Sequence, residues 1–127
     1  MSTIRSFHDL TVWQRSIELS VQIYTLTRSF PKEEIFGLTN QLRRASVSIS
    51  SNIAEGQSRL TKGEFLNSLS IARGSNAEVR SQLTLARHLG FGDQAQITCC
   101  ESQAIEISKM LNALISSLKS SRTTTSA

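Results

Sequence analysis

A carboxylate, a carboxamide and a glycine lie close together among mostly small side chains at residues 50–59, SSNIAEGQSR. Such a combination suits an active site or a ligand site, but it also suits a place where two helices pack closely. Catalysis by Glu55 would require a second group acting with it, such as a paired carboxylate or a nucleophile with its base. The surrounding sequence places no such group beside it, so we do not expect an enzyme.

The spacing of the small residues favours helix packing. Asn52 and Gly56 fall on the same helical face as Ile49, and small residues there allow two helix backbones to approach closely. We expect Asn52 to pair with Asn76 of the next helical segment, because a buried amide pair fixes the register of two helices. Glu55 borders this face, where it can meet a cation of a neighbouring helix. We therefore interpret the stretch as a packing seam, with a small-ligand site as the alternative.

Seven basic residues form the second candidate site. The chain has a net charge of +4, and the whole excess lies in residues 36–92, where seven Arg and Lys residues outnumber three Glu residues. The seven are Arg43, Arg44, Arg59, Lys62, Arg73, Arg80 and Arg87. The last three recur every seven residues, so they line one side of a helix.

Two interpretations of these basic residues remain open. In the first they form a phosphate-facing stripe, whose binding to nucleic acid would weaken steeply with salt and read sequence poorly. In the second they form a solvated face with partial ion pairing to Glu55 and Glu101, which adds little stability. Few aromatic residues interleave the basic ones, and no zinc finger, RNA-recognition signature or recognition-helix motif is evident.

No residue pattern indicates a metal or a cofactor. His8 and His88 are isolated, and Cys99 and Cys100 are adjacent rather than spaced as metal ligands. A phosphate-binding glycine loop is also missing. No apolar run approaches the roughly 20 residues of a membrane span, and the N-terminus lacks the apolar segment of a signal peptide. We therefore expect a cytoplasmic protein that needs no cofactor.

Four predicted helices carry these candidates. Apolar residues recur at alternating steps of three and four, which is typical of amphipathic helices packed as a bundle. The main apolar stripes of the predicted helices span residues 10–24, 38–56, 65–86 and 97–118. The signals that separate them are Pro31, the capping pattern of Thr61 with Glu64, Gly90, Gly92 and the helix cap Asp93. We expect one all-α four-helix domain at residues 1–119 and a disordered tail at residues 120–127.

The first predicted helix carries two apolar stripes. One contains Leu10, Trp13, Ile17 and Tyr24, with Ser20 between them and Val21 beside them. The other contains Val12, Leu19, Ile23, Leu26 and Phe30, with Ser16 in register. We assign the first stripe to the core of the bundle. The second stripe then suits the subunit interface of a homo-oligomer, and a broad core face that needs no partner is the alternative.

Three segments resemble the motifs of a known family. They are FHDLTVWQRSIEL near the N-terminus, FPKEEIFGLTNQLRRASVSISSNIAEGQSR in the centre, and FLNSLSIARGSNAEVRSQLTLARHLGF after it. The chain resembles, over roughly residues 7–91, the bacterial four-helix-bundle proteins encoded in intervening sequences of 23S ribosomal RNA genes. It is also similar to the accessory variability protein of diversity-generating retroelements.

This resemblance implies an antiparallel up-down-up-down bundle that assembles into a homopentameric ring without enzymatic activity. It also implies binding of nucleic acid, and the retroelement relative suggests a reverse transcriptase as a protein partner. The chain departs from the family pattern at three positions. Ser50 replaces a frequent Pro, Asn76 replaces the usual Leu, and Arg80 replaces a common acid, which adds positive charge.

From the residues and the resemblance together we expect a non-enzymatic oligomer. It would bind RNA or DNA electrostatically through a basic face of the second and third helices. The alternative is a structural scaffold that recruits a protein partner such as a reverse transcriptase.

Overall fold

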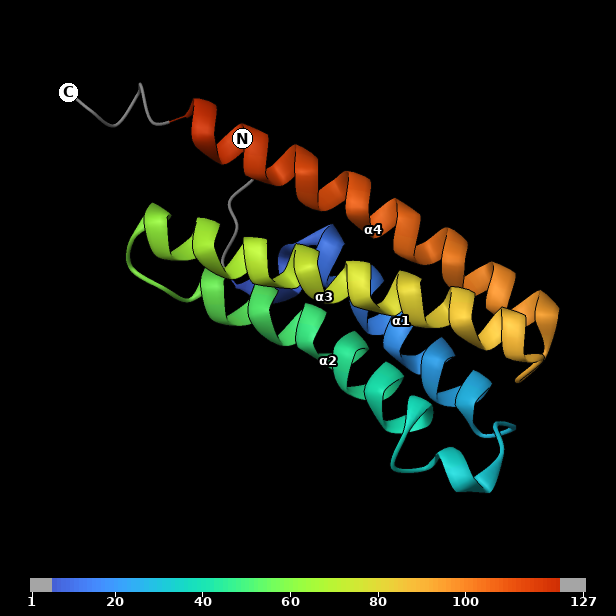
Figure 1. Ribbon diagram of the computed structural model, residues 1–127. Helices are drawn as coiled ribbons and strands as arrows, with labels where there is room; N and C mark the ends of the chain where they lie inside the picture. The colour runs from blue at the N-terminus through green and yellow to red at the C-terminus, as the bar shows by residue number, and fades with distance from the viewer. Residues whose placement is uncertain (1–5, 122–127) are drawn as a thin grey trace.

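The computed structural model describes residues 6–121, which fold into helices only (Figure 1). Its α-helices are α1 (Thr11–Thr27), α2 (Leu38–Gln57), α3 (Lys62–Leu89) and α4 (Gln94–Ser120). Short 3-10 helices, η1 (Phe7–Asp9) and η2 (Lys32–Glu34), precede α1 and α2. The four predicted helices and their packing as a bundle are therefore confirmed. Of the expected tail, residues 122–127 lie outside the described residues, and Ser120 ends α4.

Each helix packs against the next one along the chain, and α4 packs back against α1 (Figure 1). Short turns join α2 to α3 and α3 to α4, so these neighbours run antiparallel. Within residues 6–121, α1 makes no close backbone contact with α3, and α2 makes none with α4. Helices α1 and α3 therefore occupy diagonal corners of the bundle. No helix in this part of the chain combines the length and the apolar character that a membrane span requires.

The helix ends follow the predicted capping signals. The hydroxyl of Thr61 accepts a hydrogen bond from the backbone N–H of Glu64 at 3.1 Å, which caps α3. Asp93 caps α4 in the same way, by accepting from the N–H of Gln96 at 2.9 Å. Gly90 ends α3 with a φ of 74°, a left-handed conformation that glycine adopts without a steric penalty.

The apolar residues that recur at steps of three and four along α2, α3 and α4 are largely buried, as packing in a bundle requires. Fully buried side chains at these positions include Leu42, Ile49, Leu69, Val79, Leu83, Ile97, Ile107 and Leu111. Each helix places them on one face at helical spacing. Burial of this single stripe on each helix stabilises the bundle and fixes which side of each helix remains on the surface.

The core stripe of α1 is not the one expected. Val12, Leu19, Ile23, Leu26 and Phe30 are buried in the core of this chain. Their assignment to a subunit interface is therefore wrong. The stripe extends to the turn between α3 and α4, where the ring of Phe30 packs on that of Phe91 with centroids 5.7 Å apart.

The stripe assigned to the core lies largely on the surface. Ile17, Val21 and Tyr24 are 37%, 58% and 41% exposed. Leu10 and Trp13 are half-buried against the edge of the core. We call Ile17, Val21 and Tyr24 the α1 surface row. Its position leaves an apolar strip of α1 without a partner in the described chain.

Candidate nucleic-acid interface

Arg87, at the C-terminal end of α3, is held by side chains of α4. Its Nη2 donates to Glu101 Oε1 at 2.6 Å and to Thr98 Oγ1 at 2.8 Å. Its Nη1 donates to Gln94 Oε1 at 3.1 Å. The carboxylate balances the guanidinium charge, so Arg87 anchors α3 to α4 rather than offering a free charge to a phosphate. Partial ion pairing of the arginine stripe with Glu101, the second interpretation of the sequence, is confirmed at this residue.

Arg73 and Arg80 keep their charge. Arg73 Nη1 donates to Asn112 Oδ1 of α4 at 3.1 Å, which positions the guanidinium without neutralising it. Arg80 is exposed, and within residues 6–121 its guanidinium makes no hydrogen bond or ion pair. Two uncompensated guanidinium groups therefore line the surface where α3 meets α4.

Two lysines of α4 extend this surface. The contacts of Arg87 and Arg73 with α4 fix the antiparallel register of the two helices. Lys119 lies seven residues beyond Asn112 and so continues the same face of α4 toward the start of α3. Lys109 lies one turn before Asn112, and both lysines are exposed. We call Arg73, Arg80, Lys109 and Lys119 the basic row.

The other four predicted residues do not join the basic row. Arg43 faces α1, where its Nε donates to Thr27 Oγ1 at 2.9 Å and its Cζ lies 4.7 Å from the ring centre of Tyr24. Arg44 borders a groove between α2 and α3. Arg59 and Lys62 lie at the turn between these helices. The seven basic residues are thus spread over three sides of the bundle.

Sequence reasoning missed the contribution of α4. It placed the basic face on the second and third helices because the charge excess lies in residues 36–92. A signal for α4 was nonetheless present, since Thr98, Asn112 and Lys119 share the seven-residue spacing of the arginines. When each of two consecutive antiparallel helices carries a row of residues with the same spacing, the two rows can face each other along the contact between the helices.

The stretch at residues 50–59 is a packing seam, as predicted. A Cβ atom added to Gly56 would lie 2.6 Å from Ser68 Cβ, so α3 leaves no room for a side chain there. Elsewhere along the same two helices, the hydroxyl groups of Ser48 and Ser75 form a 2.9 Å hydrogen bond with each other. Small residues therefore bring α2 and α3 close together.

The contact predicted between Asn52 and Asn76 is wrong. Asn52 is half-buried and donates to the carbonyl of Ser48 in its own helix at 2.8 Å. Asn76 lies on the α4 side of α3, where it donates to the carbonyl of Ala104 at 2.9 Å. The two amides face different helices and cannot pair.

Glu55 also has a different partner from the one expected. Its carboxylate forms an ion pair with Arg59 at 3.3 Å. Arg59 lies one helical turn later in the chain, just beyond the end of α2, rather than on a neighbouring helix. Both side chains are about half exposed, so solvent screening makes this pair a weak contribution to stability.

The two cysteines have different environments. Cys100 is buried, and its burial, together with the nearby Cys99 and Glu101, raises the pKa of its thiol to about 12. The thiol therefore stays protonated and unreactive at neutral pH. Cys99 is exposed on α4. No cluster of three or more His, Cys, Asp or Glu residues within residues 6–121 is arranged to hold a metal ion.

Comparisons with known proteins agree with this architecture. No functionally curated protein matches the chain. A solved structure of a Bacteroides thetaiotaomicron protein, described as of unknown function and from the S23 ribosomal protein family, is 26% identical to it. That match covers 83% of this chain and 98% of the other, with a TM-score of 0.74. The family model of the 23S rRNA-intervening sequence protein matches residues 8–113. The chain therefore belongs to the 23S rRNA-intervening sequence protein family.

Proposed function

We propose that this protein is a non-enzymatic, cytoplasmic homo-oligomer that binds RNA or DNA through the basic row. The observation that carries the proposal is the pair Arg73 and Arg80, two guanidinium groups without a carboxylate partner on one face of α3. Lys109 and Lys119 add charge beside them. Guanidinium and ammonium groups in a row suit the phosphates of a nucleic-acid backbone.

Assembly would strengthen this binding. The family resemblance implies a homopentameric ring, and a ring repeats the basic row in every subunit. Repetition around a closed assembly raises the local positive potential and attracts polyanions over a longer range. The basic row consists of arginine and lysine side chains alone. We therefore expect it to contact phosphates rather than to stack on bases.

The test is a fluorescence-anisotropy titration of a labelled structured RNA and a labelled DNA duplex at two salt concentrations. We expect Arg73→Gln with Arg80→Gln to weaken binding to both. The slope of log affinity against log salt should fall by about one for each guanidinium removed from a phosphate contact. Oligomer size is measured on every variant by light scattering.

The matched control removes two charges from elsewhere. Arg28 and Lys32 lie after the end of α1 and are exposed. Arg28→Gln with Lys32→Gln should leave the salt slope close to that of the wild type. Equal losses in both double variants would show that net charge alone, and not the basic row, drives binding.

Absence of binding by the wild type at low salt would contradict the proposal. The alternative would then be a scaffold that recruits a protein partner such as a reverse transcriptase. The exposed α1 surface row favours that alternative, because an uncovered apolar strip suits a protein contact. A pull-down with the reverse transcriptase would test it.

A further inference from the structure

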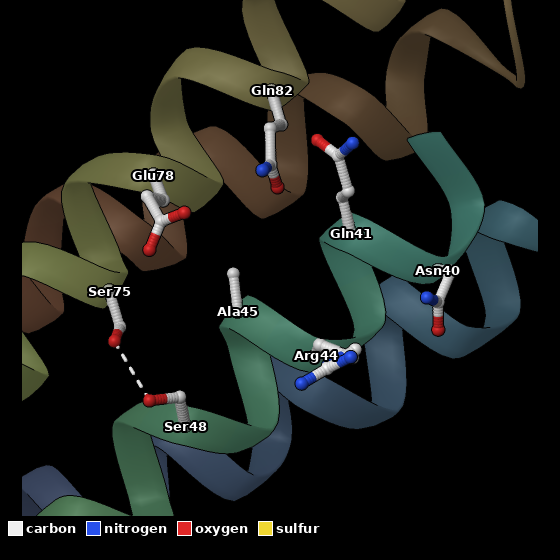
Figure 2. Close-up of a pocket in the computed structure, with 8 residues that line it drawn as sticks. All are labelled: Asn40, Gln41, Arg44, Ala45, Ser48, Ser75, Glu78 and Gln82. Carbon is white, nitrogen blue, oxygen red and sulfur yellow. Dashed lines mark hydrogen bonds between the residues drawn. The ribbon is translucent and has the colours of Figure 1, made fainter. Parts of the chain in front are cut away.

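A polar groove lies between α2 and α3 (Figure 2), whereas the basic row lies where α3 meets α4. Its volume is about 360 Å³, within the range of small-ligand sites. Ala45 lies at its base, and the hydrogen bond between Ser48 and Ser75 closes one end. The groove is therefore part of the packing between two helices, and its walls are held by the fold.

Apart from Ser48 and Ser75, polar side chains of this groove lack partners within residues 6–121. Gln82 Oε1 is buried and, within residues 6–121, accepts no hydrogen bond. Glu78 and Arg44 line opposite walls without forming an ion pair with each other. Figure 2 shows the side chains of Gln41, Glu78 and Gln82 directed into the space between the helices. A buried acceptor without a donor is uncommon in folded proteins and calls for an explanation.

The arrangement of these groups restricts the class of ligand. Glu78 presents acceptors on the α3 wall, and turning the Gln82 side chain would bring its buried Oε1 to the groove, so a bound group must donate hydrogen bonds there. Arg44 presents a guanidinium on the α2 wall, which suits a phosphate. A simple anion would be repelled by Glu78, and an apolar molecule would leave the acceptors unpaired. A ligand that carries both an amino group and a phosphate meets both demands.

We propose that the groove binds a nucleotide whose base carries an exocyclic amino group. The amino group donates to Glu78 and Gln82, and the phosphate contacts Arg44. Carboxylates and side-chain amides recognise base amino groups in this way in nucleic-acid complexes. For a nucleotide within a strand this inference rests on the proposed function, and it adds base recognition that the basic row lacks. A free nucleotide would present the same chemistry.

Cytosine and uracil provide the test, because cytosine carries an amino donor at the 4-position and an acceptor at N3, whereas uracil carries a carbonyl acceptor at the 4-position and a donor at N3. A carbonyl would place a third acceptor against Glu78 and Gln82. We expect a labelled oligocytidylate to bind about tenfold more tightly than an oligouridylate of equal length. Cytidine monophosphate, added alone in an NMR titration, should shift the amide signals of groove residues more than uridine monophosphate does.

The variant Glu78→Ala with Gln82→Met removes both acceptors while keeping good helix-forming residues. It should lose the preference for cytosine and keep the salt-dependent affinity that the basic row supplies. The control Glu33→Ala with Gln96→Met makes the same changes outside the groove and should keep the preference. Circular dichroism confirms that both variants are folded.

The outcomes separate the two proposals. Equal binding of the two oligonucleotides by the wild type, or a preference that survives Glu78→Ala with Gln82→Met, overturns the groove proposal and leaves the basic row intact. Shifts by cytidine monophosphate without oligonucleotide binding support the groove as a site for free nucleotides and overturn the proposed function. Discrimination between oligonucleotides that the groove variant loses supports a strand as the source of the base.

Discussion

Gly56 shows how one residue fixes the distance between two helices. An added Cβ would meet Ser68 Cβ at 2.6 Å and Phe65 Cδ1 at 3.0 Å. The first of these atoms is attached to the α3 backbone and cannot move aside without moving the helix. We therefore expect Gly56→Ala to destabilise the protein by about 1–2 kcal/mol, because overpacking outweighs the gain in helix propensity. Urea denaturation measures the change.

The control is a glycine in open space. Gly74 lies within α3, and a Cβ added there would meet no atom within 4 Å. Gly74→Ala should stabilise the protein by up to about 1 kcal/mol, since glycine is a poor helix former. Stabilisation by both substitutions would show that α2 and α3 are not in close contact at Gly56.

At the scale of the elements, the sequence predicted the helices better than it predicted the faces of α1. A single apolar stripe on α2, α3 and α4 left one way to bury each helix. Helix α1 has two apolar stripes, and the one that contains Trp13 and Tyr24 was wrongly assigned to the core. The burial of α1 is decided by the fit of Leu26 and Phe30 against the turn between α3 and α4, where side-chain atoms of both would meet a Cβ added to Gly92. This long-range contact has no local signal.

The candidate sites show the same limit. Seven-residue spacing correctly placed Arg73, Arg80 and Arg87 on one side of α3. It could not reveal that Glu101 neutralises Arg87, because that contact depends on the register between α3 and α4. The wrong pairing of Asn52 with Asn76 has the same origin. Spacing along one helix locates a face, whereas the partner of that face is a property of the fold.

Paired alanine substitutions test the corrected assignment of α1. Leu19 is fully buried, whereas Ile17 is 37% exposed. Leu19→Ala should destabilise the protein by about 2–5 kcal/mol through lost burial and a residual cavity. Ile17→Ala should cost well under half as much, because part of its side chain already contacts water. Similar losses for the two variants, measured by urea denaturation, would contradict the assignment.

The placement of the two surface rows matters for the whole molecule. The α1 surface row and the two arginines of the basic row lie on helices at diagonal corners of the bundle, whereas the two lysines lie on α4, which packs against α1. Assembly through α1 would therefore leave Arg73 and Arg80 of every copy accessible. Val47 of α2 extends the apolar strip, since it is 41% exposed and lies one turn after Arg43, which contacts α1. A second copy suits this corner because residues 1–35 carry equal numbers of acidic and basic side chains.

A charge introduced at Val21 tests whether the protein self-associates through the α1 surface row. Val21 is the most exposed residue of that row. By light scattering, the wild type should have a mass that is a multiple of 14.0 kDa, with five copies expected from the family resemblance. Val21→Glu should lower that mass and leave the helical content unchanged, because burying an unpaired carboxylate in an apolar interface is unfavourable. The control Leu85→Glu changes a similarly exposed residue of α3 and should keep the wild-type mass. An unchanged mass for Val21→Glu would place the interface on another face of the bundle. A changed mass for Leu85→Glu would place the interface on α3. Assembly and nucleic-acid binding would then compete for the same helix.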